Sequence, residues 1–104
     1  MKVVLKSKRQ THYATGEYDG KGILIHKGSK INLVDSYPDM PINIRNSRQD
    51  RAVVSEDGTL LSDRYVSAPS GAAVFVTGRS TNGFIAWRPN DEMSLKEFLS
   101  RSSE

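Results

Sequence analysis

The stretch from residue 65 to 88 constrains the fold of this chain more than any other segment, because it predicts several consecutive elements. Tyr65 and Val66 end an apolar run that is typical of a strand. Pro69 follows, and proline is favoured in the first turn of a helix, where its missing N–H is not needed. Apolar residues then recur at helical spacing, and Gly78 stands where a left-handed cap would end the helix. We therefore predict a strand followed by a helix.

After that helix the sequence predicts a turn and a second strand. Asn82-Gly83 has the chemistry of a tight turn. The apolar run from Phe84 to Trp87 fits a short buried strand, and we expect Trp87 to lie in the core. Residues 65–88 are thus predicted to form the centre of the fold.

The same stretch resembles a known family. The residues that carry the resemblance are Ser67-Ala68-Pro69-Ser70-Gly71-Ala72-Ala73, then Gly78-Arg79-Ser80, then Asn82-Gly83-Phe84 and Trp87. They are similar to a small domain of unknown function found at the C-terminus of GIY-YIG nucleases and restriction-modification proteins, a relative of the RAMA (restriction-enzyme adenine methylase associated) domain. With Ala14-Thr15-Gly16 and Gly28-Ser29, the resemblance spans about residues 13–99. It implies an accessory domain of DNA-modification systems, for which nucleic-acid binding is proposed. The structural signature comprises Gly28, Ser29, Ser67, Pro69, Ser70, Gly78, Gly83 and Trp87.

Three residues depart from the family pattern. Ala68 replaces a serine; if that serine caps the helix in relatives, Ser67 or water must substitute. Gly71 replaces a typical alanine, which weakens the start of the helix. Phe84 replaces the more usual tryptophan and removes an N–H donor. If relatives use that indole for recognition, the ligand of this protein differs.

The composition is that of one globular domain. The 104 residues are 26% charged and 37% hydrophobic, and they suffice for a single core. No apolar run approaches the roughly 20 residues of a membrane helix, and we expect no signal peptide. The lack of cysteine excludes disulfides and cysteine-bound zinc and is compatible with a cytoplasmic site. We expect a cytoplasmic single domain without membrane contact, in which residues 1–10 and 101–104 are the candidates for loose order.

Residues 13–26 are predicted to form a β-hairpin. Asp19-Gly20 is a strong signal for a two-residue turn. That turn places Gly16 opposite Ile23 and Ala14 opposite Ile25, so one face carries small residues opposite isoleucines and should pack against a helix. Tyr18, beside the turn, is expected to be the most exposed tyrosine. The residues before the hairpin are interpreted as an edge strand or a loose end.

The rest of the chain predicts short elements joined by loops. Asn46 or Ser47 is the candidate cap of a helix over about residues 48–55, with Ala52 and Val53 facing inward. Residues 59–66 are the next predicted strand. Ser94 is expected to cap a final helix with Glu97 as its capping-box partner. The order of elements predicts an α+β domain: a small, mainly antiparallel sheet with an N-terminal β-hairpin and about three short helices packed on one face.

Two groups of polar residues are candidates for nucleic-acid contacts. Residues 1–30 hold seven Lys and Arg against two acids, whereas residues 31–104 hold eight against ten. A basic patch attracts phosphates, although a solvated surface explains it equally well. The residues predicted to contact phosphates are Lys21, Lys27 and Lys30 on the hairpin, with Arg79, Ser80 and Asn82 in the turn. The favoured alternative for the turn is a connector, in which Gly78 caps the helix, Asn82-Gly83 reverses the chain and Arg79 pairs with an acid.

Nothing in the sequence predicts catalysis, a cofactor or a metal site. Ser67 and Ser70 lack a recognisable general base, because the only histidines are His12 and His26, in or beside the hairpin. Two histidines without further ligands make a poor metal site. We therefore predict a non-enzymatic accessory module that binds nucleic acid. Duplex DNA and a nuclease or methylase are the candidate partners, in a restriction-modification or mobile-element system. The alternative is a protein-interaction or regulatory module without affinity for nucleic acid.

Overall fold

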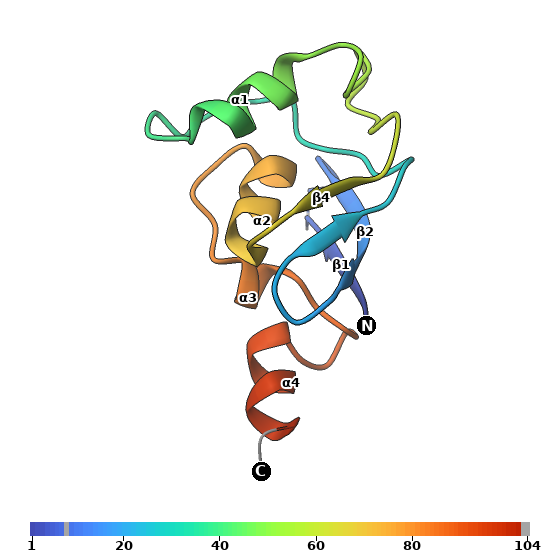
Figure 1. Cartoon of the computed structure of the whole chain (residues 1–104), viewed down its shortest axis with the longest axis vertical. Helices are drawn as coiled ribbons and strands as arrows, with labels where there is room; N and C mark the ends of the chain where they lie inside the picture. Colours follow the sequence, from blue (N-terminus) through green and yellow to red (C-terminus); the bar gives the residue numbers. More distant parts are fainter. Residues whose placement is uncertain (8, 103–104) are drawn as a thin grey trace.

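The computed structural model describes residues 1–7 and 9–102 (Figure 1). The elements follow in the order β1 (Lys2–Lys6), β2 (Tyr13–Tyr18), β3 (Ile23–Ile25), α1 (Ile42–Gln49), β4 (Arg64–Val66), α2 (Pro69–Thr77), α3 (Gly83–Ala86) and α4 (Leu95–Ser102). Within the described residues the strands form one antiparallel sheet in the order β1-β2-β3-β4. The predicted α+β class, antiparallel sheet and N-terminal hairpin are confirmed, and β1 is an edge strand.

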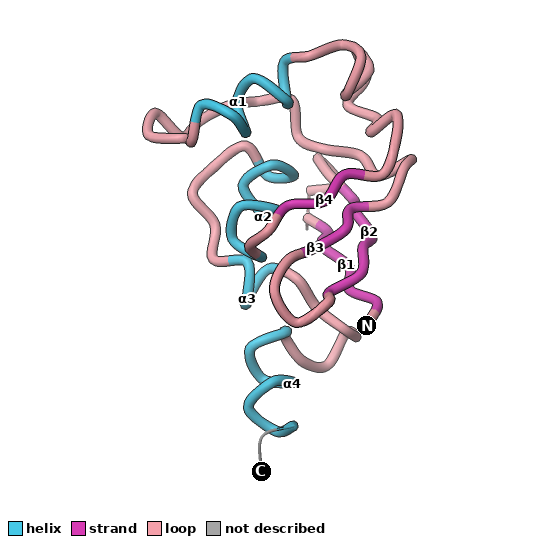
Figure 2. Tube along the Cα trace, viewed as in Figure 1, coloured by secondary structure: helices cyan, strands magenta, loops and turns pink. Residues whose placement is uncertain are grey.

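One face of the sheet is buried and the other is turned to solvent. The buried face carries Val3, Leu5, Ala14, Gly16, Ile23 and Ile25. Helix α2 lies against this face and contacts β2, β3 and β4, while α1 packs on α2 (Figure 1). The prediction that the face with small residues opposite isoleucines would meet a helix is therefore confirmed. Long loops join β3 to α1 and α1 to β4 (Figure 2).

The register of the hairpin differs from the prediction. Tyr18 pairs with Ile23 and Gly16 with Ile25, so the loop comprises residues 19–22 instead of two residues. The carboxylate of Asp19 accepts main-chain hydrogen bonds from Lys21 at 2.9 Å and Gly22 at 2.8 Å, which closes the loop. A side chain on Gly22 would meet the Val66 carbonyl of β4 at 2.3 Å. The two-residue turn was wrong because this side-chain closure and the neighbouring strand set the loop length.

Helix α2 begins and ends as predicted. Pro69 is its first residue, and Gly78 ends it in the left-handed conformation, with φ 74°. A side chain at Gly78 would also lie 2.1 Å from the Val34 carbonyl, so glycine is required there twice over. Ala68 occupies the N-cap position without a side-chain hydrogen bond, and Ser67 does not substitute for the missing serine.

Residues 83–86 form a short helix, and the predicted strand over Phe84–Trp87 is wrong. The Asn82 side chain accepts a hydrogen bond from the Phe84 N–H at 3.0 Å and thereby caps α3. Phe84 and Ile85 are 36% and 52% exposed, whereas Trp87 is fully buried, as expected. A four-residue apolar run carries too little periodicity to distinguish a strand from a helix.

Helix α1 lies earlier in the chain than predicted. It begins after Pro41 and ends at Gln49, so Asn46 and Ser47 are interior residues and not caps. The prediction of an inward-facing Ala52 is wrong, because Ala52 is exposed. The pattern misled because Arg48, a charged residue that normally marks a solvent face, is one of the buried residues of this helix.

The last two predicted elements are present with adjusted limits. Strand β4 covers only the end of the predicted 59–66 segment, and Thr59 and Leu60 form isolated bridges with Lys30 and Val54. The capping box of α4 is confirmed: the Glu97 N–H donates to Ser94 Oγ at 3.3 Å, and the Ser94 N–H reaches the Glu97 carboxylate at 3.5 Å. None of the helices in the described part of the chain combines the length and hydrophobicity that a bilayer crossing requires.

Candidate nucleic-acid interface

Two adjoining hollows open where the end of β1, the loop after it, residues 32–36 and the turn after α2 meet. The larger has a volume of about 690 Å³ and the smaller about 390 Å³. Lys6, Ser7 and His12 line both. We call the two hollows together the basic groove, because the cationic side chains that line them are Lys6, Arg9, Lys30 and Arg79.

The turn that carries Arg79 is held by hydroxyl groups. Thr77 Oγ1 and Thr81 Oγ1 lie 2.7 Å apart, and both lie within hydrogen-bonding distance of the Arg79 carbonyl, at 3.1 and 2.9 Å. Residues 32–36 are fastened to the same turn, since the Ser36 N–H donates to the Gly78 carbonyl at 2.9 Å. The backbone around Arg79 is therefore fixed, while its side chain is exposed at the rim of the groove.

The groove cations differ in their acidic neighbours: Lys30 lies close enough to Asp57 for its charge to help lower the pKa of that carboxyl. Among residues 1–7 and 9–102, the side chains of Arg9, Lys30 and Arg79 form no ion pair with an acid. The alternative in which Arg79 pairs with an acid therefore finds no such pair in this part of the chain. Lys6 pairs with Asp91 at 3.2 Å, but both side chains are exposed, and such pairs contribute about 0–1 kcal/mol.

His12 is a buried histidine whose pKa is affected by the charge of the groove. Its side chain is 4% exposed and its Nδ1 lies 3.1 Å from Thr11 Oγ1. Burial, and then the positive charge of Arg79, hold the pKa of His12 below its ordinary value of 6.5. An anion bound beside Arg79 would oppose both effects. The pKa of His12 therefore depends on the charge of one groove cation, Arg79.

The structure brings together only part of the predicted phosphate-binding set. Lys30 and Arg79 line the groove, whereas Lys21, Lys27, Ser80 and Asn82 line neither of its hollows. Lys21 lies in the hairpin loop, beyond the opposite end of β2 from Tyr13, and β2 from Tyr13 to Tyr18 spans about 17 Å by the rise of a strand.

Sequence reasoning missed Lys6, Arg9 and His12 as members of one site. The only available signal was the excess of basic residues in the first 30 positions. The expected exposure of Tyr18 is also wrong: Tyr18 is partly buried against the core, and Tyr13 and Tyr65 are exposed instead.

Several signature residues join α2 to α3. The Trp87 indole N–H donates to the Pro69 carbonyl at 3.2 Å, and the Gly83 N–H donates to Ser70 Oγ at 3.0 Å. A side chain on Gly83 would lie 2.0 Å from that same carbonyl. The pattern by which the family is recognised therefore includes contacts that hold two helices together.

Gly28 and Ser29 stabilise the end of the hairpin. Gly28 adopts φ 89°, and Ser29 Oγ accepts a hydrogen bond from the Thr15 N–H at 3.1 Å. This contact extends the pairing between β2 and the residues that follow β3, and it places Lys30 next to Tyr13.

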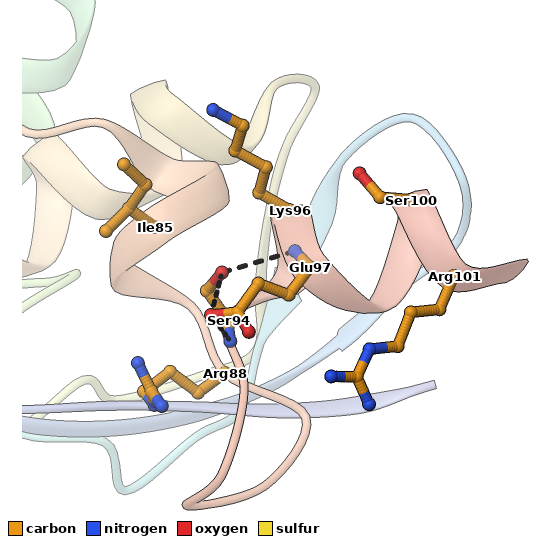
Figure 3. A pocket seen from close by; sticks show the side chains of 7 residues that line it. All are labelled: Ile85, Arg88, Ser94, Lys96, Glu97, Ser100 and Arg101. Carbon is orange, nitrogen blue, oxygen red and sulfur yellow. Dashed lines mark hydrogen bonds between the residues drawn. The ribbon is translucent and has the colours of Figure 1, made fainter.

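A third hollow, of about 430 Å³, lies between α3 and α4 (Figure 3). The Ser94–Glu97 capping box lies in its centre, with Ile85 on the α3 side. In the view of Figure 3, Lys96 extends on one side of the capping box, and Arg88 and Arg101 extend on the other. This hollow combines an exposed apolar side chain with three cations and one acid.

Among the described residues no group of three or more His, Asp or Glu side chains is placed to hold a metal ion.

Comparison with known proteins identifies the family. No curated protein and no solved structure matches the chain. The profile of one family, described as "Domain of unknown function (DUF4357)", matches residues 4–99. Because this match covers nearly the whole chain, the protein belongs to the DUF4357 family.

Proposed function

We propose that this domain is a non-enzymatic module that binds nucleic acid through backbone phosphates at the basic groove. The observation that carries the proposal is that Lys6, Arg9, Lys30 and Arg79, from separate segments, line two hollows that share Lys6, Ser7 and His12, and that Arg9 and Arg79 form no ion pair with an acid among the described residues. Phosphates release counterions when such cations neutralise them, which supplies most of the affinity of sequence-independent binding.

The setting we propose is the cytoplasm, beside a restriction, modification or mobile-element enzyme. The support is the resemblance of the Ser67–Trp87 segment to domains that accompany GIY-YIG nucleases and other restriction-modification proteins. In this setting the module holds DNA and its nuclease or methylase partner performs the chemistry.

The salt dependence of binding tests the proposal. The dissociation constant of a short duplex and of a single strand should be measured by fluorescence anisotropy between low and physiological salt. Arg79→Ala and Lys30→Ala should each reduce the slope of log K against log salt by about one. Lys21→Ala removes the same charge at the far end of β2 and is the matched control, so its slope should not change. Equal slopes for all four proteins would remove the groove from the footprint.

The α3–α4 surface favours a second candidate, a protein-interaction module. Ile85 exposes an apolar side chain in the hollow of Figure 3, which Arg88, Lys96 and Arg101 also line, and the preceding residue, Phe84, is exposed as well. An apolar patch with a basic rim suits a partner segment that is both apolar and acidic. A pull-down tests this function: the domain should retain a purified nuclease or methylase after the sample has been treated to digest nucleic acid. Ile85→Asp should lose this retention and Arg79→Ala should keep it. That result would establish protein interaction as the function in place of nucleic-acid binding.

A further inference from the structure

Tyr13 stands out on the open face of the sheet. Its side chain is 54% exposed although it belongs to β2, where it pairs in register with Lys6 of β1. On its other side Tyr13 and Lys30 exchange both main-chain hydrogen bonds, at 2.9 and 2.8 Å. Residues directly opposite each other in antiparallel strands share one face of the sheet. The three side chains therefore form a row, with an exposed aromatic ring between two lysines.

This row borders the smaller hollow of the basic groove. The hollow has a volume of about 390 Å³, within the range of roughly 300–1,000 Å³ that small-molecule sites occupy. Neighbouring side chains in such a row lie about 5 Å apart at Cβ, so both ammonium groups can reach the edges of a ring that lies on Tyr13. Gln10 lines the same hollow and carries an amide donor and an amide acceptor.

We infer that a nucleic-acid base stacks on Tyr13 while Lys6 and Lys30 contact the flanking phosphates, so that the ligand of the groove is a single-stranded segment. This inference rests on the proposed function and specifies its ligand. In a duplex both faces of each base are covered by the neighbouring base pairs, and a side chain reaches a base face only when the base is unpaired. An aromatic ring beside a basic groove is the combination that binds single strands with little sequence preference.

Comparison of three ligands tests the inference: a single strand of about 12 adenine nucleotides, an abasic strand of the same length, and the corresponding duplex. We expect the native protein to bind the adenine strand roughly 5- to 150-fold more tightly than the abasic strand, which is the range that one base stacked on an aromatic side chain provides. Tyr13→Ala should abolish this preference, so that the variant binds the adenine strand and the abasic strand with equal affinity. Tyr13→Phe retains the ring and should retain the preference.

Tyr65→Ala is the matched control. Tyr65 is 47% exposed on the same face of the sheet but lines neither hollow of the groove, so its loss should leave the preference intact. Thermal denaturation checks that each variant is folded. If the native protein binds both strands but without preference, or if Tyr13→Ala keeps the preference, the stacking inference is wrong and the phosphate-binding proposal stands. If none of the three ligands binds at low salt, both are wrong.

Discussion

Replacing Arg48 with methionine tests how the groove wall is held to the rest of the fold. Arg48 lies in α1, is 4% exposed, and donates to the Phe75 carbonyl in the last turn of α2 at 2.6 Å. It also donates to the carbonyls of Asn32 at 2.7 Å and Val34 at 3.3 Å. One guanidinium therefore ties together α1, the end of α2 and residues 32–34, which form part of the wall of the basic groove.

The expected loss follows from these contacts. Methionine keeps the apolar stem but removes every donor, so the carbonyls of Phe75 and Asn32 lose short bonds to a charged group. Each such bond contributes about 1.5–3 kcal/mol, and a cation at a helix C-terminus adds up to about 2 kcal/mol in a buried setting. Desolvation of the charge, which also lowers the pKa of Arg48, opposes these gains. We expect the free energy of unfolding to fall by about 3–4 kcal/mol, out of a typical total of about 5–15 kcal/mol.

Urea denaturation followed by circular dichroism measures this loss. Arg51→Met is the matched control, because Arg51 is exposed and, within residues 1–7 and 9–102, donates only to nearby carbonyls of its own loop, those of Val54 and Ser55. Its cost should stay within about 1 kcal/mol. If Arg48→Met costs no more than Arg51→Met, the reasoning that Arg48 fastens the groove wall is refuted.

Three further predictions concern the same region. Gly78→Ala should lower the free energy of unfolding far more than Gly20→Ala. Both glycines have positive φ (74° and 95°), but of the two only Gly78 has a carbonyl and a guanidinium within 2.6 Å of an added Cβ. Equal free energies of unfolding for the two variants would contradict this. The pKa of His12 lies below 6.5 in the folded state, so as the pH falls the unfolded chain protonates this histidine before the folded protein does. The contribution of neutral His12 to the free energy of unfolding is therefore full above about pH 6.5 and is lost as the pH falls through the folded-state pKa. Arg79→Ala should raise the pKa of His12, as followed by NMR of its ring protons, and an unmoved pKa would show that the two groups do not interact.

The sequence predicted those elements whose chemistry is complete within a few residues. Pro69 and Gly78 mark the two ends of α2, and the Ser94–Glu97 pair marks the start of α4. The buried face of the hairpin also followed from alternation, because a change of two residues in register keeps each side chain on the same face.

The failures occur where a contact distant in sequence decides the local structure. Gly22 belongs to the hairpin loop because β4 passes beside it, and the sequence around Gly22 does not predict that contact. Arg48 is of a residue type that is normally found at the surface, yet it is buried, because carbonyls of two other segments accept hydrogen bonds from its guanidinium. The apolar residues Phe84 and Ile85 indicate a core strand, yet only Trp87 of that run is buried.

The candidate site shows the same division. The basic N-terminal third singled out Lys30, and the polar turn after α2 singled out Arg79; folding places each of them on one of the two hollows of the groove. Lys21 and Lys27 carry the same charge and are left outside it, a distinction that depends on hairpin register and loop path. Tyr13 could not be separated from the other tyrosines until the sheet showed which of its faces is open.

The central claim is that the basic groove binds nucleic acid, and an amide NMR titration tests it most directly. Short single-stranded and duplex DNA, unmodified and methylated, should be added to the labelled domain at low and at physiological salt. The account predicts salt-sensitive shifts clustered on residues 9–13, 30–36 and 77–81, with residues 19–22 of the hairpin loop unmoved. A spectrum that stays unchanged at low salt, or shifts centred on the hairpin loop or on α3 and α4, would contradict it.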